Sequence, residues 1–523
     1  MKNIYILAFL ISSIGNSVAQ QITFQKVYGT FGSDMANLVR QTTDGGYIIV
    51  GVRNSSGPSN EDIYLIKTDS IGDTLWTKTF GGGGDDFGNF VEQTSDGGYI
   101  VTGYTNYSGY SDVYLIKTDA NGNALWSKSI GGAGVSYNFG TSVQQTLDGG
   151  YIITGHTNSF SAGPYDVYLI KTNANGDTSW TKTIGGTGSE TGLSVMQTTD
   201  GGYIIIGYSD NFSGTLNDIY LVKTDSDGNV LWAKTFGGTG NEYGLAVQQT
   251  NDGGYMIAGW TNSFGNGNEN VYLIKTNASG DTLWSKAYNA GVNDSRGYSF
   301  RQTNDGGYII TGYTDSFIGN EDIYLIKTDV NGDTLWTRTF GGTSYNYGNS
   351  VMQTADGGYI IAGVSGAFGA GLFDFYLIKT DANGNSGCNQ GNTATIVFTP
   401  ATQVTSPATI VSSGGIITNL TAIVGSGGTV TTLCTTVGIS SYSNFNFPIT
   451  LSPNPATNNF TITFPHIINK GAIEIYNVLG EKVMEEVVFN VSAKEIFLSV
   501  NPGIYFLEII ADGERSVRKI VKQ

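Results

Sequence analysis

The sequence predicts an all-β protein, in which a seven-bladed β-propeller with four strands per blade is followed by a small C-terminal β-sandwich. Two markers with one period carry this prediction. The segment Asp-Gly-Gly-Tyr occurs seven times, at steps of 51–53 residues, starting at Asp44, Asp96, Asp148, Asp200, Asp252, Asp305 and Asp356. The segment Tyr-Leu-Ile/Val-Lys-Thr also occurs seven times, starting at Tyr64, Tyr114, Tyr168, Tyr220, Tyr272, Tyr324 and Tyr376. A period of about 52 residues is typical of propellers and solenoids.

Each repeat is expected to form four short antiparallel strands, which we call a, b, c and d. In the second repeat these strands are predicted at residues 89–94, 99–104, 113–118 and 124–130. Between strands a and b, the Asp-Gly-Gly segment predicts a tight hairpin, because glycine supplies the positive φ that such turns need. Four short strands per repeat are typical of a propeller blade.

The two ends of the repeat region predict that the first strand of the chain completes the last blade. Strand d carries a tryptophan in six repeats, at Trp76, Trp126, Trp180, Trp232, Trp284 and Trp336, and the seventh repeat ends before this strand. Residues 22–29 align with residues 74–81, and Phe24 takes the tryptophan position. Since a unit divided between both ends closes a ring and leaves no open edge, the pattern favours a ring over an open solenoid.

The chain is expected to divide into four parts. Lys2, an apolar run at residues 4–11 and small residues at 17–19 predict a signal peptide. The alternative, a membrane anchor, is disfavoured because the apolar run is too short to span a bilayer. The predicted parts are a signal peptide at 1–19, the propeller at 20–385, a Thr-, Ser- and Gly-rich β-element or linker at 386–450, and a C-terminal domain at 451–523.

The two cysteines, Cys388 and Cys434, both lie outside the repeats. In an exported chain we expect them to pair and to staple a small β-element, because extracellular compartments are oxidising. Two free thiols in a stiff Thr-rich spacer are the alternative.

The last part of the chain alternates apolar residues with turn signals, which predicts a small β-sandwich. Its Pro-Asn-Pro opening, Tyr-Asn-Val-Leu-Gly hairpin, Gly-Ile-Tyr strand and basic end resemble the type A C-terminal sorting domain of the type IX secretion system. The residues that carry this resemblance are Pro453, Asn454, Pro455, Gly480, Gly503, Tyr505, Lys519 and Lys522. The resemblance implies passage through the periplasm and across the outer membrane, removal of the domain by a sortase, and a cargo that is anchored at the surface or released. The repeats themselves resemble those of secreted seven-bladed propeller proteins.

Charge and composition limit the classes of partner. Lys and Arg number 26 against 43 Asp and Glu, and the net charge is −17. Such an acidic chain is a poor partner for nucleic acid or anionic membranes. No transmembrane segment is predicted after the signal peptide. We therefore expect the secretion machinery, its sortase and a glycan or protein ligand as partners.

One position in the repeats suggests a binding surface. The b–c and d–a connections are expected to lie on one face and to be longer than the a–b and c–d turns, and long loops on a rigid scaffold often bind ligands. The residue after the glycine that ends strand b is Val52, Tyr104, His156, Tyr208, Trp260, Tyr313 or Val364. Tyr104, His156, Tyr208, Trp260 and Tyr313 would offer flat surfaces to sugars, peptides or apolar side chains. Packing between neighbouring blades is the competing interpretation and the preferred one.

Catalytic and metal-binding patterns are sparse. The chain has two histidines, His156 and His466, so it has little material for a catalytic triad or a zinc site. We predict no catalytic residue, no metal site and no cofactor, with weak Ca²⁺ association at residues 225–229 as the exception considered. The leading hypothesis is a secreted or surface binding protein. The alternatives are a polysaccharide-active, glycoside hydrolase-like enzyme that uses the loop carboxylates Asp85, Asp86, Glu190 and Glu242, and a purely structural surface protein.

Overall fold

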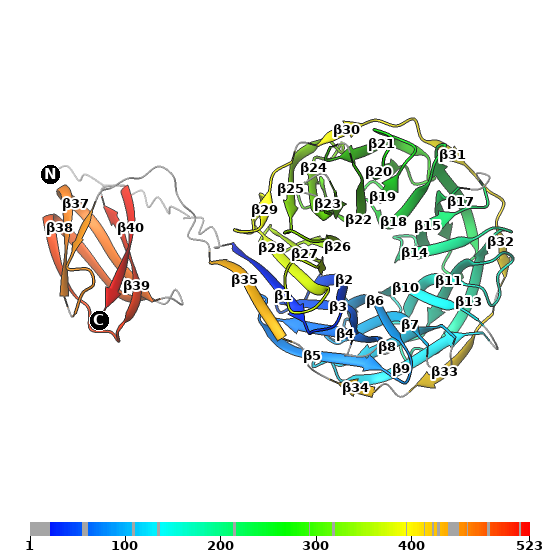
Figure 1. The fold of residues 1–523 in the computed structure, drawn as a ribbon, viewed down its shortest axis with the longest axis horizontal. Helices are drawn as coiled ribbons and strands as arrows, with labels where there is room; N and C mark the ends of the chain where they lie inside the picture. The colour runs from blue at the N-terminus through cyan, green and yellow to red at the C-terminus, as the bar shows by residue number, and fades with distance from the viewer. Residues whose placement is uncertain are drawn as a thin grey trace, which may run out of the picture. The chain divides into compact units, whose positions relative to one another are not determined.

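The computed structural model describes residues 21–522, except 55–60, 107–109, 133–135, 213–215, 292, 316–319, 394, 413, 421–422, 426–428, 438–448, 458, 478–481 and 512–513. The predicted signal peptide and Gly480 lie outside the described residues. Strands, turns and loops make up the described part of the chain, which confirms the all-β prediction. The chain separates into two compact units, residues 1–438 and 439–523 (Figure 1).

The described part of the first unit contains seven sheets. Six contain four antiparallel strands from one repeat, and the seventh contains three from its repeat and the first strand of the chain. The first three sheets contain β2 (Asp34–Gln41), β3 (Tyr47–Asn54), β4 (Glu61–Thr68) and β5 (Thr74–Gly81); β6 (Asp86–Gln93), β7 (Tyr99–Thr105), β8 (Asp112–Thr118) and β9 (Ala124–Gly131); and β10 (Asn138–Gln145), β11 (Tyr151–Thr157), β12 (Asp166–Thr172) and β13 (Thr178–Gly185).

The next sheets repeat this order. They contain β14 (Glu190–Gln197), β15 (Tyr203–Ser209), β16 (Asp218–Thr224) and β17 (Val230–Gly237); β18 (Glu242–Gln249), β19 (Tyr255–Thr261), β20 (Asn270–Thr276) and β21 (Thr282–Asn289); β22 (Ser295–Gln302), β23 (Tyr308–Thr314), β24 (Asp322–Thr328) and β25 (Thr334–Phe340); and, in the seventh, β26 (Asn346–Gln353), β27 (Tyr359–Ser365) and β28 (Asp374–Thr380). The repeat prediction of four strands per unit is confirmed.

Strand a begins earlier than the sequence suggested. In the second repeat it was expected from residue 89, whereas β6 begins at Asp86. The pairing of β6 with β7 shifts register between Gly88 and Phe90, which is the mark of a β-bulge. The bulge interrupts the alternation of apolar and polar residues, so the first residues of the strand do not follow the pattern of the rest.

The two sequence markers meet in one contact at each hairpin. In the first repeat, Asp44 accepts hydrogen bonds from Thr42 Oγ1 and from the backbone N–H of Gly46, and Gly45 has φ 82°. The buried Lys67, from the second marker, lies 2.9 Å from the same carboxylate. The equivalent ion pairs are Lys117–Asp96, Lys171–Asp148, Lys223–Asp200, Lys275–Asp252, Lys327–Asp305 and Lys379–Asp356. This shared role explains why both markers recur with one period.

The first strand of the chain, β1 (Ile22–Gly29), pairs with β28 and completes the seventh sheet. Phe24 is fully buried there and packs with residues of the first and seventh sheets. The seventh sheet also contacts the first, since Asn349 Nδ2 donates to the carbonyl of Ala36 at 2.8 Å. Figure 1 shows the sheets in sequence order around a common centre, with the a strands innermost.

Residues 386–437, which we call the girdle, do not form the separate β-element that was expected. They contain β29 (Gln390–Gly391), β30 (Ile396–Phe398), β31 (Gln403–Thr405), β32 (Ile410–Ser412), β33 (Ile416–Leu420), β34 (Ile423–Gly425) and β35 (Thr429–Val437). Each adds a fifth strand to a different sheet, in the order sixth, fifth, fourth, third, second, first and seventh (Figure 1). Strands this short are unstable as an independent sheet, and they gain partners by joining existing outer strands.

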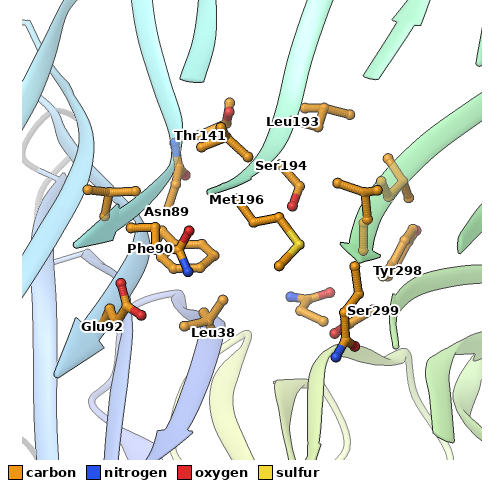
Figure 2. Close-up of a pocket in the computed structure, with 18 of the residues that line it drawn as sticks. Leu38, Asn89, Phe90, Glu92, Thr141, Leu193, Ser194, Met196, Tyr298 and Ser299 are labelled. Carbon is orange, nitrogen blue, oxygen red and sulfur yellow. The ribbon is translucent and has the colours of Figure 1, made fainter. Parts of the chain in front are cut away.

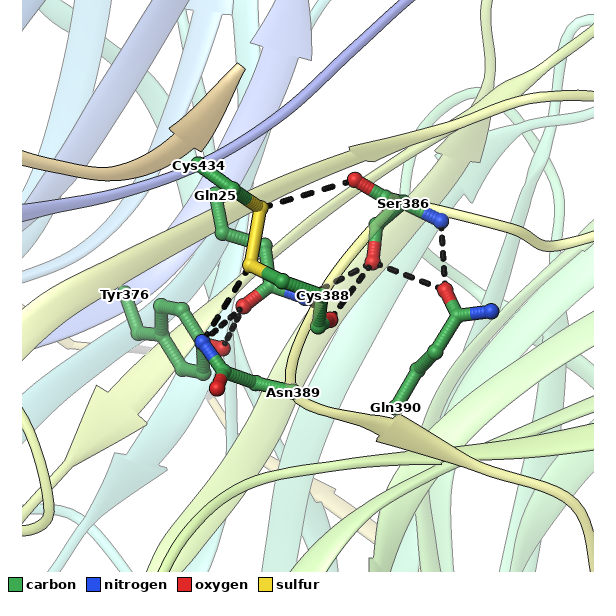
Figure 3. The surroundings of a disulfide bond; sticks show 7 residues. All are labelled: Gln25, Tyr376, Ser386, Cys388, Asn389, Gln390 and Cys434. Atoms are coloured by element: carbon green, nitrogen blue, oxygen red, sulfur yellow. Dashed lines mark hydrogen bonds between the residues drawn. A yellow bond between two sulfur atoms is a disulfide. The ribbon is translucent and has the colours of Figure 1, made fainter. Parts of the chain in front are cut away.

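A disulfide between Cys388 and Cys434 joins the two ends of the girdle (Figure 3). Cys434 lies in β35 opposite Gln25 of β1, and the side chain of Gln25 donates to Ser386 Oγ at 2.7 Å. The first strand of the chain, the last repeat and both ends of the girdle therefore meet at one place.

The second unit contains β36 (Thr450–Ser452), β37 (Asn459–Asn477), β38 (Lys482–Phe497), β39 (Gly503–Ala511) and β40 (Glu514–Lys522). The long strand β37 pairs with β36 and β38 near its start, and with β38 and β39 near its end. Both halves contribute to one core, with Phe460 and Ile462 from the first half and Ile473 and Ile475 from the second.

Candidate functional site

The five residues singled out in the sequence all lie at the ends of b strands, directly opposite the second residue of an a strand. The cross-strand pairs are Tyr104 with Phe87, His156 with Phe139, Tyr208 with Thr191, Trp260 with Tyr243, and Tyr313 with Arg296. The b–c and d–a connections begin and end at this edge. We call these ten residues, together with Tyr347 of β26, the rim.

The first half of the rim is a series of ring contacts that crosses from the second sheet to the third. Phe87 stacks on Tyr104 with ring centroids 4.5 Å apart, and Tyr104 meets the edge of Phe139 at 4.7 Å. Phe139 stacks on His156 at 4.6 Å. Burial lowers the pKa of His156 to about 4, so the imidazole is neutral at physiological pH.

The second half of the rim begins in the fourth sheet and runs to the seventh. Tyr243 contacts Tyr208 at 4.5 Å and stacks on Trp260 at 4.3 Å. Further along, Tyr313 meets the edge of Tyr347 at 5.3 Å. The contacts of Tyr208 with Tyr243 and of Tyr313 with Tyr347 cross between neighbouring sheets, as packing requires, whereas Tyr243 and Trp260 are cross-strand partners in the fifth sheet. Tyr104, His156 and Tyr208 nevertheless stay only half-buried, whereas Trp260 and Tyr313 are buried.

Arg296 breaks the sevenfold pattern of the rim. Its guanidinium lies 4.4 Å from the ring centre of Trp260 and 5.9 Å from that of Tyr313. The same guanidinium forms a two-bonded ion pair with Glu269, which follows from the planar fork of an arginine facing a carboxylate. This segment therefore combines flat apolar faces with fixed charges and is the most distinctive part of the rim.

Sequence reasoning found the b-strand half of the rim and missed the a-strand half. Phe87, Phe139, Tyr243, Arg296 and Tyr347 each stand directly before a glycine of strand a, at the repeat period. Alignment of the repeats on that glycine would have found them. The late start predicted for strand a concealed the signal.

The d–a connections are shorter than expected. Residues 82–85 join β5 to β6, whereas the a–b turn spans residues 42–46. The reason is a side-chain cap, because Asp86 accepts a hydrogen bond from the backbone N–H of Gly82 at 2.9 Å and draws the connection tight. The b–c connections, such as residues 158–165, are the longer ones.

Three of the four loop carboxylates considered for catalysis are caps of this kind and are buried rather than solvated. Asp86, Glu190 and Glu242 are at most 1% exposed. Glu190 accepts from the N–H of Gly186, and Glu242 from that of Gly238. Each of these three carboxylates therefore caps the d–a connection that leads into its own strand. Asp85 accepts a bond from the N–H of Glu61.

Burial raises the pKa of Asp86 to about 6, and the nearby Asp62 adds to the shift. A raised carboxyl pKa contributes stability that is present below the unfolded pKa and is lost as the pH rises through about 6. We expect Asp86→Asn to raise the free energy of unfolding at pH 8 by about 2–3 kcal/mol and to flatten its pH dependence between pH 5 and pH 8. Urea unfolding at each pH measures both effects.

The chain itself offers a precedent for Asp86→Asn and a matched control. Asn138 stands at the equivalent position of the third sheet and donates to Asp112 at 3.1 Å, so asparagine is accepted there. Asp227→Asn, which makes the same chemical change at an exposed turn, is the control, and we expect it to change the free energy of unfolding by less than about 0.5 kcal/mol. Identical pH profiles for the wild type and Asp86→Asn would contradict the prediction.

The turn considered for Ca²⁺ is an ordinary hairpin of the repeat. Asp225 accepts hydrogen bonds from the N–H groups of Asp227 and Asn229 at 2.9 and 2.8 Å, as Asp69 does in the first repeat. Within the described ranges, no cluster of three or more His, Cys, Asp or Glu side chains is placed to hold a metal ion.

In the second unit, the Pro-Asn-Pro opening lies against the basic end of the chain. Asn454, between Pro453 and Pro455, donates to the carbonyl of Lys519 at 2.8 Å and accepts from the N–H of Val521 at 2.9 Å. Lys522 donates to the carbonyl of Thr457. In β39, Gly503 begins the strand, and Tyr505 donates to the carbonyl of Asn501. The structure therefore joins the two ends of the motif.

Comparison with known proteins identifies the second unit. Residues 450–523 match the model of the secretion system C-terminal sorting domain. No curated protein matches the chain. Among solved structures, Sqt1 from Chaetomium thermophilum is 12% identical with a TM-score of 0.39, over 64% of this chain and 81% of that one.

A puromycin hydrolase mutant complexed with PGG is 11% identical with a TM-score of 0.40, and the match covers 70% of this chain and 53% of that one. The chain thus spans about half the length of the hydrolase. No helix in the described part of the chain is long and apolar enough to cross a membrane. The match at residues 450–523 confirms the resemblance seen in the sequence: this part of the chain is a secretion system C-terminal sorting domain, the tail of type IX secretion cargo, which implies export to the cell surface or secretion.

Proposed function

We propose that this protein is a secreted or surface-bound β-propeller that binds a glycan at its rim. Residues 21–437 form a closed seven-bladed ring in this proposal, and residues 451–523 a small β-sandwich. A signal peptide at residues 1–19 brings the chain to the periplasm, the type IX machinery exports it, and a sortase removes the tail. The proposal includes no cofactor.

Closure of the ring is supported by contacts between the two ends of the repeat region. β1 pairs with β28 along five residues, from Phe24 with Lys379 to Tyr28 with Phe375. The backbone N–H of Ala355 in the seventh sheet is bonded to Gln41 of the first at 2.9 Å. Such contacts would be absent in an open solenoid.

The observation that carries the binding function is the half-exposure of rings that are already held in place. Tyr104, His156 and Tyr208 each pack against at least one neighbouring ring and remain only half-buried. Rigid aromatic faces bind sugar rings and lose little conformational entropy. The hydroxyl of Tyr243, bonded to Asn217 at 2.7 Å, and the Arg296–Glu269 pair add polar groups.

Glycan-array binding by the full chain tests this function. Valine occupies the rim position in the first and seventh repeats, as Val52 and Val364, so Tyr104→Val and Tyr208→Val retain a residue that the fold accepts. We expect each variant to weaken binding about tenfold, because each removes one aromatic face.

Leu147→Ser is the matched control, since Leu147 is 92% exposed in an a–b turn at the opposite edge. Its binding should equal that of the wild type. Binding of no glycan, or equal binding by the rim variants, would overturn the proposal in favour of a structural surface protein. Hydrolysis of a bound glycan would instead favour the enzyme.

A further inference from the structure

The a strands enclose a cavity of about 400 Å³ along the axis of the sheets (Figure 2). Its wall comes from the a strands of all seven sheets and includes Phe90, Thr141 and Met196. Glu92 of β6 is one of the lining residues, and its carboxylate lies on the cavity wall (Figure 2). The cavity lies away from the rim, nearer the a–b turns, because its residues come from the middle and end of strand a.

One position at the end of strand a links each sheet to the next. In five of the seven sheets, a side-chain acceptor bonds the N–H of the following sheet's glutamine. These contacts are Glu92 to Gln145, Gln144 to Gln197, Met196 to Gln249, Gln248 to Gln302 and Met352 to Gln41. A role repeated in most sheets is structural.

Arg40 and Arg301 occupy this position in the remaining two sheets and cannot play that role, because a guanidinium has no acceptor. Each bonds instead to a carbonyl of its own strand, Arg40 to Val39 at 3.0 Å and Arg301 to Phe300 at 2.9 Å. Both line the cavity, and both are half-buried. Arg40 also lies 5.0 Å from the ring centre of Phe90. Among the described residues, the other N–H groups of the two guanidiniums have no hydrogen-bond partner, so they can serve a ligand.

The charges around the two arginines are not balanced. In the part of the chain that the structure describes, neither guanidinium forms an ion pair within 4.0 Å. Glu92 is the carboxylate among the residues that line the cavity, and one of its oxygens already accepts a hydrogen bond from the backbone N–H of Gln145. Burial is the main cause that lowers the pKa of Arg40, and Arg301, which lines the same cavity, adds to the shift.

We propose that the axial cavity binds a small oxyanion, a carboxylate or phosphate group, between the guanidiniums of Arg40 and Arg301. The planar fork of arginine matches two oxygens of such a group, and the ligand would relieve the repulsion between the two cations. Gln248, which also lines the cavity, has an amide that supplies a further donor. This site is independent of the glycan proposed for the rim.

Titration calorimetry of the full chain at pH 7 and constant ionic strength tests the site, with inorganic phosphate, citrate and galacturonate as separate probes. We expect saturable binding of at least one probe. Comparison of phosphate with the two carboxylates, citrate and galacturonate, shows which class of ligand the site prefers. Arg40→Gln and Arg301→Gln should each weaken that binding about tenfold, and the double variant about a hundredfold. Glutamine is the residue that the chain itself carries at this position in Gln144 and Gln248.

Lys78→Gln with Lys182→Gln makes a charge-matched control, because both lysines lie on outer strands and bond to asparagine side chains. The control should bind the anion as the wild type does. A melting curve without anion checks that the arginine variants stay folded. No saturable binding of any probe, or equal binding by the folded double variant and the wild type, would overturn the proposal.

Discussion

Replacing Phe24 with alanine is expected to lower the free energy of unfolding by about 3–5 kcal/mol, the range for large-to-small changes in a core. Phe24 is fully buried and meets the edge of Tyr47 with ring centroids 6.2 Å apart. It belongs to β1, which is the outer repeat-type strand of the seventh sheet and packs against the first. A cavity at this position weakens the junction between the first and last repeats. Guanidinium unfolding followed by tryptophan fluorescence measures the loss.

Leu75→Ala is the matched control for this prediction. Leu75 lies in β5, the equivalent strand of the first sheet, and is 57% exposed. We expect its effect to stay within about 0.5 kcal/mol, as for most surface changes. Equal losses for Phe24→Ala and Leu75→Ala would show that β1 does not hold the two ends of the repeat region together.

Removing the disulfide is expected to lower the free energy of unfolding by about 4 kcal/mol. The bond joins residues 46 positions apart, and in the chain-entropy model a loop of that length restricts the unfolded state by about this amount. Cys388→Ser with Cys434→Ser should therefore unfold at lower denaturant than the oxidised wild type. The same effect should follow reduction of the wild type.

Ile410→Ser, in the exposed part of β32, serves as the control for a change in the girdle that leaves the bond intact. Limited proteolysis gives a second readout, because release of one end of the girdle should expose residues 388–434 to cleavage. Identical unfolding midpoints for the oxidised and reduced wild type would refute the prediction.

The repeat part of the fold could be predicted because its signals are local and periodic. Asp44 and Lys67 are near in sequence, they meet at one hairpin, and each recurs in every repeat. Even the long-range pairing of β1 with β28 could be predicted, since Phe24 matches the recurring tryptophan of strand d. The girdle carried no such signal. Its strands are short and Thr-rich, and each pairs with a strand far away in the sequence, so nothing local specifies the partner.

The candidate sites divide in the same way. Tyr208 and Trp260 were found because each follows the glycine that ends strand b, at the repeat period. Phe87 and Tyr243 were missed because strand a was expected to begin after them, beyond the bulge. The burial of Asp86 follows from its place in the sheet and not from its residue type. Arg40 and Arg301 are unusual because the residues at the same position in the other repeats accept a hydrogen bond from the next sheet. The structure was needed to show this acceptor role, so the sequence alone did not single out the two arginines.

The pairing of the girdle has a consequence for the behaviour of the protein in a crowded solution. Without residues 386–437, the outer strand of each of the seven sheets would present a row of unpaired N–H and C=O groups, a template on which strands of other molecules can assemble into aggregates. With the girdle in place, a strand such as β5 pairs with β34, and the edge strand of that sheet is then only Ile423–Gly425. Except at β35 (Thr429–Val437), the girdle strands are at most five residues long, and edges so short nucleate intermolecular sheets poorly, which suits a molecule that must remain dispersed after it has left the cell's chaperones behind.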